Sequence, residues 1–571
     1  MGGQYMLTAL TERMRPEAEV MDLQRLGSLH SSTLSFMRTL VRRIMKEEWD
    51  ISRRLFDLDP EGYGTAIYEI RTPNGVFSFV LFSTELPDEE RNDRVIATSW
   101  DLTMALCEGL VDDVWLEDLR RNVPKQEAGR VDARVFSLSR ANRSSRLFSY
   151  VLEELSAGRQ PDAQRIAEVG YLYRTTAVYG SGKLGMADWN KVRAKFPDFN
   201  RPFAPEMFIC FMLRQFSLDQ VDHVAKSRAP DTAVLLDGRL KRFFGIGNST
   251  GLGMAPYLIN HGELFSQWVE MRETALAQVL HKAAPTAWRI SLFHDLVSRA
   301  KQHFGESHTS DAEQIDRNQV LIAELSEVDS WLAGTGDQLT TWSELTDHAR
   351  DVWSLETQEL VNSICLEIHP ELVNDLEDSF AAIPNPVIDP EMSTVALRQL
   401  IETRYGWALE IDFSDATETD AFWYRSEEKL EPRLGFAGAD PGVEKQMPLP
   451  IGRRVRECYD LLIQDLAESP DSDVVHFLLR RPTMKSIVRR IQTMSRHKYA
   501  EIRANLASRD IRPMDMLRCK LAFFGVSKFD PRSKLWVRNT MYQGAPVIED
   551  IGQTYDSWFL PLKPQMEEVR A

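Results

Sequence analysis

The spacing of apolar positions changes several times along this chain of 571 residues. Up to about residue 50, leucine, methionine and isoleucine recur every three or four positions, which predicts helix. Residues 64–82 alternate instead and are rich in β-branched and aromatic side chains, which is typical of strands. The run Thr72-Pro73-Asn74-Gly75 interrupts this stretch, and Asn-Gly readily adopts the positive φ of a tight turn. We therefore expect a β-hairpin.

Helices and strands are mixed in the segments that follow. We expect helices at residues 94–110 and 142–155, where apolar positions recur with the helical period, and a strand at 171–179. Between about 204 and 380 nearly every segment has the helical period, with one exception at residues 232–236. Apolar stripes of this kind form hydrophobic cores, so the middle of the chain is predicted to be a helical body.

The chain resembles itself at a distance of about 342 residues. Gly64 and Gly406 each open a strand-like stretch at an offset of 342, and the offset between Arg140 and Arg481 is 341. Chance matches would scatter in offset, so we interpret the pattern as an internal duplication. The second copy is then expected to contain strands at 407–413, 421–426 and 517–524 and helices at 453–466 and 484–494.

These segments predict a fold of the α/β (α+β) class, in which two homologous β/α halves form a pseudo-symmetric body around a mainly helical insert. The expected domains are residues 1–200, 201–385 and 386–571, the last boundary lying at Pro384-Asn385-Pro386. A chain of this length is too long for one hydrophobic core, which favours several domains. Seams between domains are where ligand clefts often form.

Charge and composition narrow the class of function. The formal net charge is −17, and an acidic chain lacks the basic footprint that nucleic acids require. The five cysteines lie far apart, which excludes zinc ribbons, ferredoxin-type clusters and a disulfide framework. The chain has no apolar run of signal-peptide length near its start and no uncharged apolar run of 18 residues. We expect a cytoplasmic protein without a membrane partner.

The segment from Gly245 to Gly253 is the strongest candidate for chemistry. Four glycines in nine residues allow positive φ and a close approach of the backbone to a ligand. A helix is predicted from about Pro256, and loop amides beside a helix N-terminus suit a phosphate or carboxylate. The segment is neither a Walker A loop nor a dinucleotide fingerprint, and a tight structural turn is the alternative. The candidate substrate-binding residues here are Arg242, Gly245, Gly247, Asn248, Ser249, Thr250 and Gly251.

A second glycine-rich segment, residues 179–189, shares the run Leu-Gly-Met-Ala with the first. Lys183 is a candidate to contact an anion or to act as an amine of lowered pKa, with Tyr179 and Ser181 close by. Its counterpart Lys528 lies in a segment that has fewer glycines, so we expect only the first copy to keep a function and Lys528 to face solvent. An ordinary solvated lysine is the alternative for Lys183.

Two further residues are candidates for the same site. Arg140 lies in a basic stretch at the start of a predicted helix, where the helix dipole disfavours cations and arginines usually have an anionic partner, either a substrate or an acidic residue. His261 follows the glycine-rich segment closely and is the histidine best placed for catalysis. No motif of metal-ligand spacing is present, so no metal is predicted, and no cofactor is identified.

We therefore expect an enzyme that acts on a small anionic metabolite, bearing a carboxylate or phosphate, by non-redox lyase, hydrolase or group-transfer chemistry. Lys183, Tyr179 and His261 are the catalytic candidates. Two alternatives stay open: a non-catalytic ligand-sensing or assembly module, and a nucleotide-dependent ligase or kinase. The expected partner is the small anionic molecule, and assembly into a homodimer or another homo-oligomer is left open.

Overall fold

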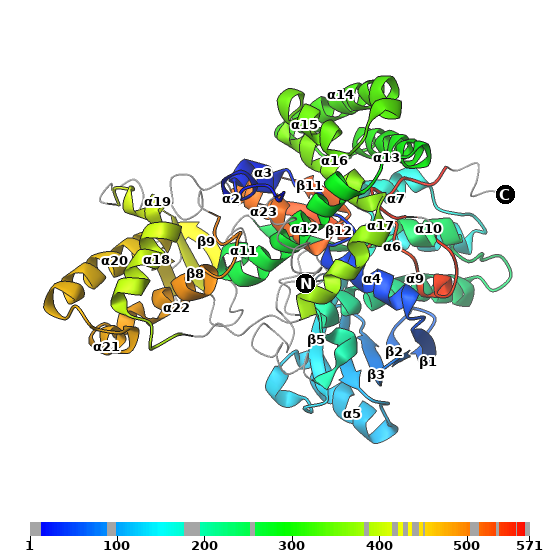
Figure 1. Cartoon of the computed structure of the whole chain (residues 1–571). Coiled ribbons are helices and arrows are strands. Elements are labelled where there is room, and N and C mark those ends of the chain that lie inside the picture. Colours follow the sequence, from blue (N-terminus) through cyan, green and yellow to red (C-terminus); the bar gives the residue numbers. More distant parts are fainter. Residues whose placement is uncertain are drawn as a thin grey trace. The chain divides into compact units, whose positions relative to one another are not determined.

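The fold was obtained as a computed structural model (Figure 1). Its chain divides into two compact units. Unit 1 comprises Met1–His30, Gly251–Pro285 and Leu339–Phe523, and unit 2 comprises Ser31–Thr250, Thr286–Gln338 and Phe524–Ala571. The domain boundaries expected near residues 200 and 385 remain a prediction. The structure describes residues 13–87, 89, 99–175, 195–251, 257–381, 388–413, 421–425, 432–436, 445–448, 451–502, 513–532, 536–555 and 557–565.

Unit 2 contains a nine-stranded sheet with the strand order β1-β2-β3-β4-β5-β6-β7-β12-β11. Each strand from β1 to β5 pairs antiparallel with the next, β6 and β7 are parallel, and β11 and β12 are antiparallel. The mixed α/β class is therefore confirmed, with a mostly antiparallel sheet. The strands are β1 (Asp50–Leu58), β2 (Gly64–Thr72), β3 (Gly75–Ser83), β4 (Leu102–Glu108), β5 (Val135–Arg143), β6 (Tyr171–Thr175), β7 (Gly245–Gly251), β11 (Lys528–Pro531) and β12 (Trp536–Met541).

The β2–β3 hairpin confirms the first prediction from the sequence. Thr72 pairs with Gly75 across a turn made by Pro73 and Asn74. Neither Asn74 nor Gly75 has a positive φ, because Pro73 presets the φ of an ordinary turn at its first position. The Thr72 hydroxyl accepts a hydrogen bond from the Gly75 N–H at 3.0 Å.

Helix α9 (Ala204–Arg228) is the core of unit 2 and lies in the connection between the parallel strands β6 and β7. A parallel pair needs such a crossover, and 21 of the 25 residues of α9 are buried. The Tyr68 hydroxyl of β2 donates to Asp219 at 2.7 Å, and that of Tyr173 in β6 donates to Gln220 at 2.8 Å. The helix therefore covers the face of the sheet that carries these tyrosines.

The opposite face of the sheet holds its own apolar cluster. Val80, Ala105 and Leu138 from β3, β4 and β5 pack there with Trp115 and Leu119 of α5. The remaining helices described in unit 2 include a pair, α13 and α14, whose buried residues recur at three and four positions like those of an antiparallel coiled coil. The helices of unit 2 are α4 (Phe36–Lys46), α5 (Asp113–Asn122), α6 (Ser145–Ser156), α7 (Ala163–Val169), α9 (Ala204–Arg228), α10 (Gly238–Phe243), α13 (Ala287–Gly305) and α14 (Ala312–Thr335).

Unit 1 is mainly helical. It also contains a three-stranded antiparallel sheet with the order β10-β8-β9, made of β8 (Ala421–Arg425), β9 (Pro432–Phe436) and β10 (Lys445–Pro448). None of the helices that the structure describes in either unit is long and apolar enough to cross a membrane. The helices of unit 1 are α2 (Glu17–Val20), α3 (Leu23–Gly27), α11 (Tyr257–Asn260), α12 (Gly262–Lys282), α15 (Ser343–Val352), α16 (Leu355–Glu367), α17 (Pro370–Val373), α18 (Thr394–Arg404), α19 (Gly406–Leu409), α20 (Ile451–Glu468), α21 (Val474–Arg480), α22 (Lys485–Met494) and α23 (Pro513–Phe524).

The structure does not show the internal duplication. Gly64 opens a strand, whereas Gly406 opens the helix α19, and Arg140 lies in β5 whereas Arg481 directly follows the helix α21. The strand predicted at 517–524 is also wrong, because these residues belong to α23. Two segments with similar apolar residues and similar glycine positions therefore adopt different secondary structures.

The remaining predicted helices and strands can be compared one by one with the structure. The helix predicted at 94–110 is wrong over Leu102–Glu108, which form β4, and the strand predicted at 407–413 is not formed. Residues 232–236 are not helical, as expected. The helical middle region is confirmed by α9 to α16, although β7 runs through it. Strand β8 and the helices α6, α20 and α22 are confirmed near their predicted positions. The break at Pro384-Asn385-Pro386 lies outside the described residues.

Candidate functional site

The described parts of the parallel strands β6 and β7 run to Thr175 and Gly251, and Arg174 pairs with Gly247, so β7 extends past the last described residue of β6. In sheets with parallel strands, ligands bind beyond the carboxyl ends of those strands. Residue 176 follows directly on Thr175, so the segment that contains Tyr179, Ser181 and Lys183 starts at this end of β6. The other glycine-rich segment, Gly245–Gly253, includes β7 itself. We call this end of the two strands the β6–β7 edge.

Buried polar side chains gather at the β6–β7 edge. The Asn248 side-chain amide donates to the Thr175 carbonyl oxygen at 2.7 Å, and the Thr175 hydroxyl donates to the carbonyl oxygen of Arg140 at 3.1 Å. The hydroxyls of Ser139 and Thr175 lie 3.3 Å apart. Each of the side chains of Ser139, Thr175 and Asn248 is at most 1% exposed. Thr175 therefore contacts the side chain of Asn248 and the backbone of Arg140, whereas the register Ala141↔Thr175 puts the Arg140 side chain on the opposite face of the sheet from that of Thr175.

Thr250 is the second predicted residue of β7 with a buried side chain, at 1% exposure. Asn539 of the neighbouring strand β12 donates its side-chain amide to the Thr250 hydroxyl at 3.4 Å. The side chain of Ser249 lies outside what the structure describes. Asn248 and Thr250 therefore already bind groups of the protein, and their first role is to order the end of β7.

Arg140 lies in β5 rather than at the start of a helix. Its guanidinium carbon lies 4.1 Å from the centre of the Trp100 ring, a cation–π contact that fixes the orientation of the guanidinium group. Arg140 is paired with Thr103 of β4 across the sheet. The carboxylate of Asp101, just before β4, accepts a hydrogen bond from the Arg143 backbone N–H at 2.8 Å.

Gly245 and Gly247 lie in a strand, which corrects the loop predicted from the sequence. Gly247 has no positive φ, and a β-carbon there would lie 2.5 Å from the Tyr171 ring. A β-carbon on Gly245 would meet the carbonyl oxygen of Met541 and the methyl group of Thr540. These glycines are explained by close packing against β6 and β12 rather than by contact with a ligand.

Arg242 precedes the amino end of β7, so about 20 Å of extended chain separates it from Gly251. Its guanidinium donates to the carboxylate of Asp550 at 2.9 Å, and this pair joins α10 to the C-terminal part of unit 2. The structure therefore does not bring Arg242 together with the side chains of Asn248 and Thr250, and we leave it out of the site.

Three predicted residues, Tyr179, Ser181 and Lys183, lie outside the described residues. Lys528, the expected counterpart of Lys183, does not face solvent as predicted, since its amine donates to the Ala167 carbonyl oxygen at 2.8 Å. Burial lowers the pKa of Lys528 to about 8. His261 belongs to unit 1, where it precedes α12 and its ring lies 4.5 Å from that of Tyr257. Its catalytic role remains a prediction.

Sequence reasoning missed Arg174 and Thr103. Arg174 of β6 pairs with Asn142 of β5, and Thr103 pairs with Arg140, so the four residues occupy adjacent strands near the β6–β7 edge. Their alternation with apolar neighbours would have revealed them once residues 102–108 were recognised as a strand. The helical interpretation of that segment hid the pattern.

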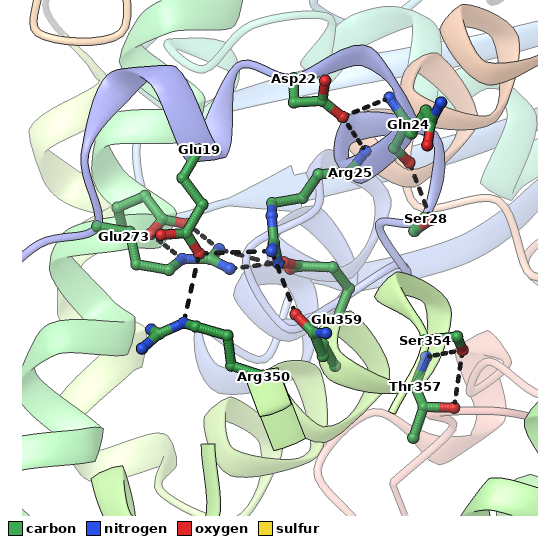
Figure 2. A network of polar contacts seen from close by, with 12 residues as sticks. Glu19, Asp22, Gln24, Arg25, Ser28, Glu273, Arg350, Ser354, Thr357 and Glu359 are labelled. Carbon is green, nitrogen blue, oxygen red and sulfur yellow. Dashed lines mark hydrogen bonds and ion pairs between the residues drawn. The ribbon is translucent and has the colours of Figure 1, made fainter. Parts of the chain in front are cut away.

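A buried network of arginines and glutamates in unit 1 was also not predicted, because its members are far apart in the sequence (Figure 2). Glu359 of α16 accepts hydrogen bonds from Arg15 at 2.6 Å and from Arg25 and Arg272 at 2.9 Å. Glu273 of α12 accepts from Arg15 at 2.7 Å and from Arg272 at 3.1 Å. The network binds the N-terminal segment of the chain to α12 and α16.

Burial alone would raise the pKa of Glu359, but the arginines hold it well below its usual range. The carboxylate is therefore charged at neutral pH and fully occupied by guanidinium donors. Figure 2 shows the side chains of Arg25, Glu273 and Glu359 converging in the interior of this unit. Because the arginines are bound to glutamates of the chain itself, the network is best explained as structural.

Comparisons with known proteins give no further information on the site. No known protein family, no curated protein and no solved structure matches this chain at a significant level. Within the described residues, no group of three or more His, Cys, Asp and Glu side chains is arranged to hold a metal ion. The chemistry of the site therefore has to be argued from its own residues.

Proposed function

We propose that the protein is an enzyme that acts on a small anionic metabolite at the β6–β7 edge, by non-redox lyase, hydrolase or group-transfer chemistry. The observation that carries the proposal is the parallel pair of strands β6 and β7. Residues 179–189 follow β6 in the sequence, and the segment Gly245–Gly253 includes β7. In a parallel pair, ligands bind beyond the carboxyl ends of the strands. The shared run Leu-Gly-Met-Ala lies beyond both strand ends.

The roles follow from the chemistry of the residues. Arg140, with its guanidinium held against Trp100, attracts the anionic group. Asn248 and Thr250 order the end of β7 through their hydrogen bonds to Thr175 and Asn539. Lys183 and Tyr179, in the segment that follows β6, handle protons, as an amine and a phenol can.

The proposal is tested by a thermal-shift screen with carboxylates, sugar phosphates, nucleotides and divalent metals. A ligand at 100 times its Kd stabilises the folded state by about 2.7 kcal/mol, which is readily measured as a rise in Tm. A compound that raises Tm is then tested against Lys183→Met. This variant should lose the rise in Tm while keeping the Tm of the unliganded protein.

The matched control is Lys195→Met, which removes a lysine that is 62% exposed and paired with Glu108. Its rise in Tm with the ligand should equal that of the wild type. The proposal fails if no anion raises Tm, or if Lys183→Met and Lys195→Met respond alike. Binding without turnover of any bound compound would favour the ligand-sensing module instead.

A further inference from the structure

One stretch of unit 1, residues 474–500, is strongly basic although the chain as a whole is acidic. It contains seven lysines and arginines and neither aspartate nor glutamate, whereas the whole chain has 68 basic and 85 acidic side chains. The stretch covers α21, the 3-10 turn Pro482–Met484 and α22. A run of like charges is either a solvated face or a binding surface, and the partners of its side chains help to distinguish the two.

Part of this positive charge is used within the protein. Arg490 donates to both carboxylate oxygens of Glu501, at 2.8 and 2.7 Å. The side chains of Lys485, Arg489 and Arg496 are exposed instead, and they form no ion pair or hydrogen bond with the residues that the structure describes. The stretch therefore presents three cations to the outside of the unit.

These cations lie on the outer side of α22. The apolar residues on its buried side are Ile487, Val488, Ile491 and Met494. Lys485 and Arg489 are four positions apart on the opposite side, and Arg496 follows the end of the helix. Like charges at this spacing repel each other along a helix, so an acidic surface placed over them would remove a cost in free energy.

Exposed apolar side chains accompany the cations. Val475 and Leu479 lie one turn apart on α21 and are 39% and 74% exposed. The 3-10 turn joins this helix directly to α22. A phosphate backbone offers no apolar group to such side chains, and the net charge of −17 repels a long polyanion. A helix that carries both carboxylates and aliphatic side chains fits this face better.

Helix α14 of the same chain has such a face. It contains five acidic residues and a single basic one, Arg317, and its buried side is lined by Gln314, Asn318, Leu321, Leu325, Val328 and Leu332. The other side presents Asp316 and Glu327, both exposed, with Val320 between them at 49% exposure. Asp316 and Glu327 are eleven residues apart, as Lys485 and Arg496 are, which is about 16 Å along a helix.

We propose that the exposed face of α21 and α22 binds the exposed face of α14 in a second copy of the chain. The inference is independent of the proposed function. It rests on the opposite charges of the two faces, on the aliphatic side chains in both, and on the exposure of both in the single chain. Helices this short bury less than about 1,200 Å², as weak and transient complexes do. The association is therefore weak and sensitive to salt.

The first test is sedimentation velocity of the full-length protein over a series of concentrations. We expect self-association whose Kd rises at least about tenfold between about 0.01 M and 1 M salt, because the Debye length falls from about 30 to about 3 Å. A protein that is monomeric at every concentration in low salt would refute the proposal. Association that does not respond to salt would refute it as well.

Reversal of the charges identifies the two faces. The variant Lys485→Glu/Arg489→Glu should not self-associate, and neither should Asp316→Lys/Glu327→Lys, because each brings like charges together. A mixture of the two variants should associate, since each keeps one native face. The control Lys125→Glu/Lys282→Glu changes the net charge as much as the first variant, at two exposed lysines outside the stretch, and should associate like the wild type.

The outcomes separate contact between these faces from a general effect of charge. A mixture that associates shows that both variants are folded. Self-association that persists in either reversed variant would refute the proposal, and so would a mixture that stays monomeric while each variant keeps the Tm of the wild type. If the control variant also loses self-association, net charge rather than these two faces controls it, and the proposal is wrong.

Discussion

Arg214 shows how unit 2 accommodates a buried charged side chain. Arg214, in the middle of α9, is 1% exposed and donates to five backbone carbonyl oxygens. Three of these carbonyls, at residues 241, 242 and 244, lie at the C-terminal end of α10, where a cation is favoured by the helix dipole. Arg214 thus replaces water for five acceptors that the interior would otherwise leave unsatisfied.

Glu206 of the same helix gives a prediction for the dependence of stability on pH. Its side chain is buried, and burial raises its pKa to about 7. The folded protein therefore holds a proton that the unfolded chain loses above about pH 4.3, so this group lowers the stability as the pH rises from about 4.3 to 7. Glu206→Gln should match the wild type at pH 4.5 and exceed it by roughly 3–4 kcal/mol at pH 8. Urea unfolding at the two pH values checks this. A Gln variant that is less stable at pH 8 would contradict it.

At the scale of residues, the sequence identified part of the site. Arg140, Asn248 and Thr250 were predicted from basic or glycine-rich surroundings, and they lie on β5 and β7, where Thr175 of β6 contacts the Arg140 backbone and the Asn248 side chain. Arg174 and Thr103 could not be found in this way, because their place depends on which strands are neighbours. Register across a sheet is a property of tertiary structure, and local spacing does not contain it.

At the scale of elements, short apolar runs are where the sequence predictions are wrong. Residues 102–108 contain good helix formers such as Leu, Met and Ala, yet they form β4 because β3 and β5 offer pairing partners on both sides. Residues 517–524 form α23 instead of the predicted strand. A run of this length fits a buried strand or a buried helix, so periodicity alone does not decide.

The glycines of β7 give a prediction at the same scale. Gly247→Ala should destabilise unit 2 by roughly 2 kcal/mol or more, because the new methyl group would overlap the Tyr171 ring and force β6 and β7 apart. Gly305→Ala, at the end of α13, has no atom within 4 Å and serves as the control. It should be neutral or slightly stabilising, since alanine favours helix. Denaturant unfolding of both variants tests this prediction. Equal free energies of unfolding for Gly247→Ala and Gly305→Ala would show that β6 and β7 are not packed this closely.

At the scale of the whole molecule, the two units are held together internally by different means. Unit 2 relies on a nine-stranded sheet around α9, and unit 1 on helices joined by the arginine–glutamate network (Figure 2). The overall α/β class followed from the mixed hydrophobic periods. The division into two units could not be predicted from these periods, because each unit combines segments that are hundreds of residues apart.

The network predicts a loss of stability that is specific to unit 1. Glu359→Gln removes the charge that three arginines share, which leaves guanidinium groups buried without their counter-ion and should cost about 3–5 kcal/mol. Folding lowers the pKa of Glu359, so its contribution to the free energy of unfolding is fully present above the unfolded pKa near 4.3. That contribution is lost as the pH falls from this value through the lowered pKa of the folded state. Calorimetry near pH 7 should show a lower Tm for the variant, whereas the control Glu154→Gln, an exposed pair with Arg159, should not. A variant as stable as the wild type would show that the network contributes little.

The central claim is that the β6–β7 edge binds a small anion, and hydrogen–deuterium exchange with and without the most stabilising compound tests it most directly. The account predicts slower exchange in peptides covering residues 136–143, 171–183 and 245–251, in the wild type but not in Arg140→Met. Slower exchange confined to the network around Arg25 and Glu359, or to residues near Arg242 and Asp550, would contradict the claim and move the site elsewhere.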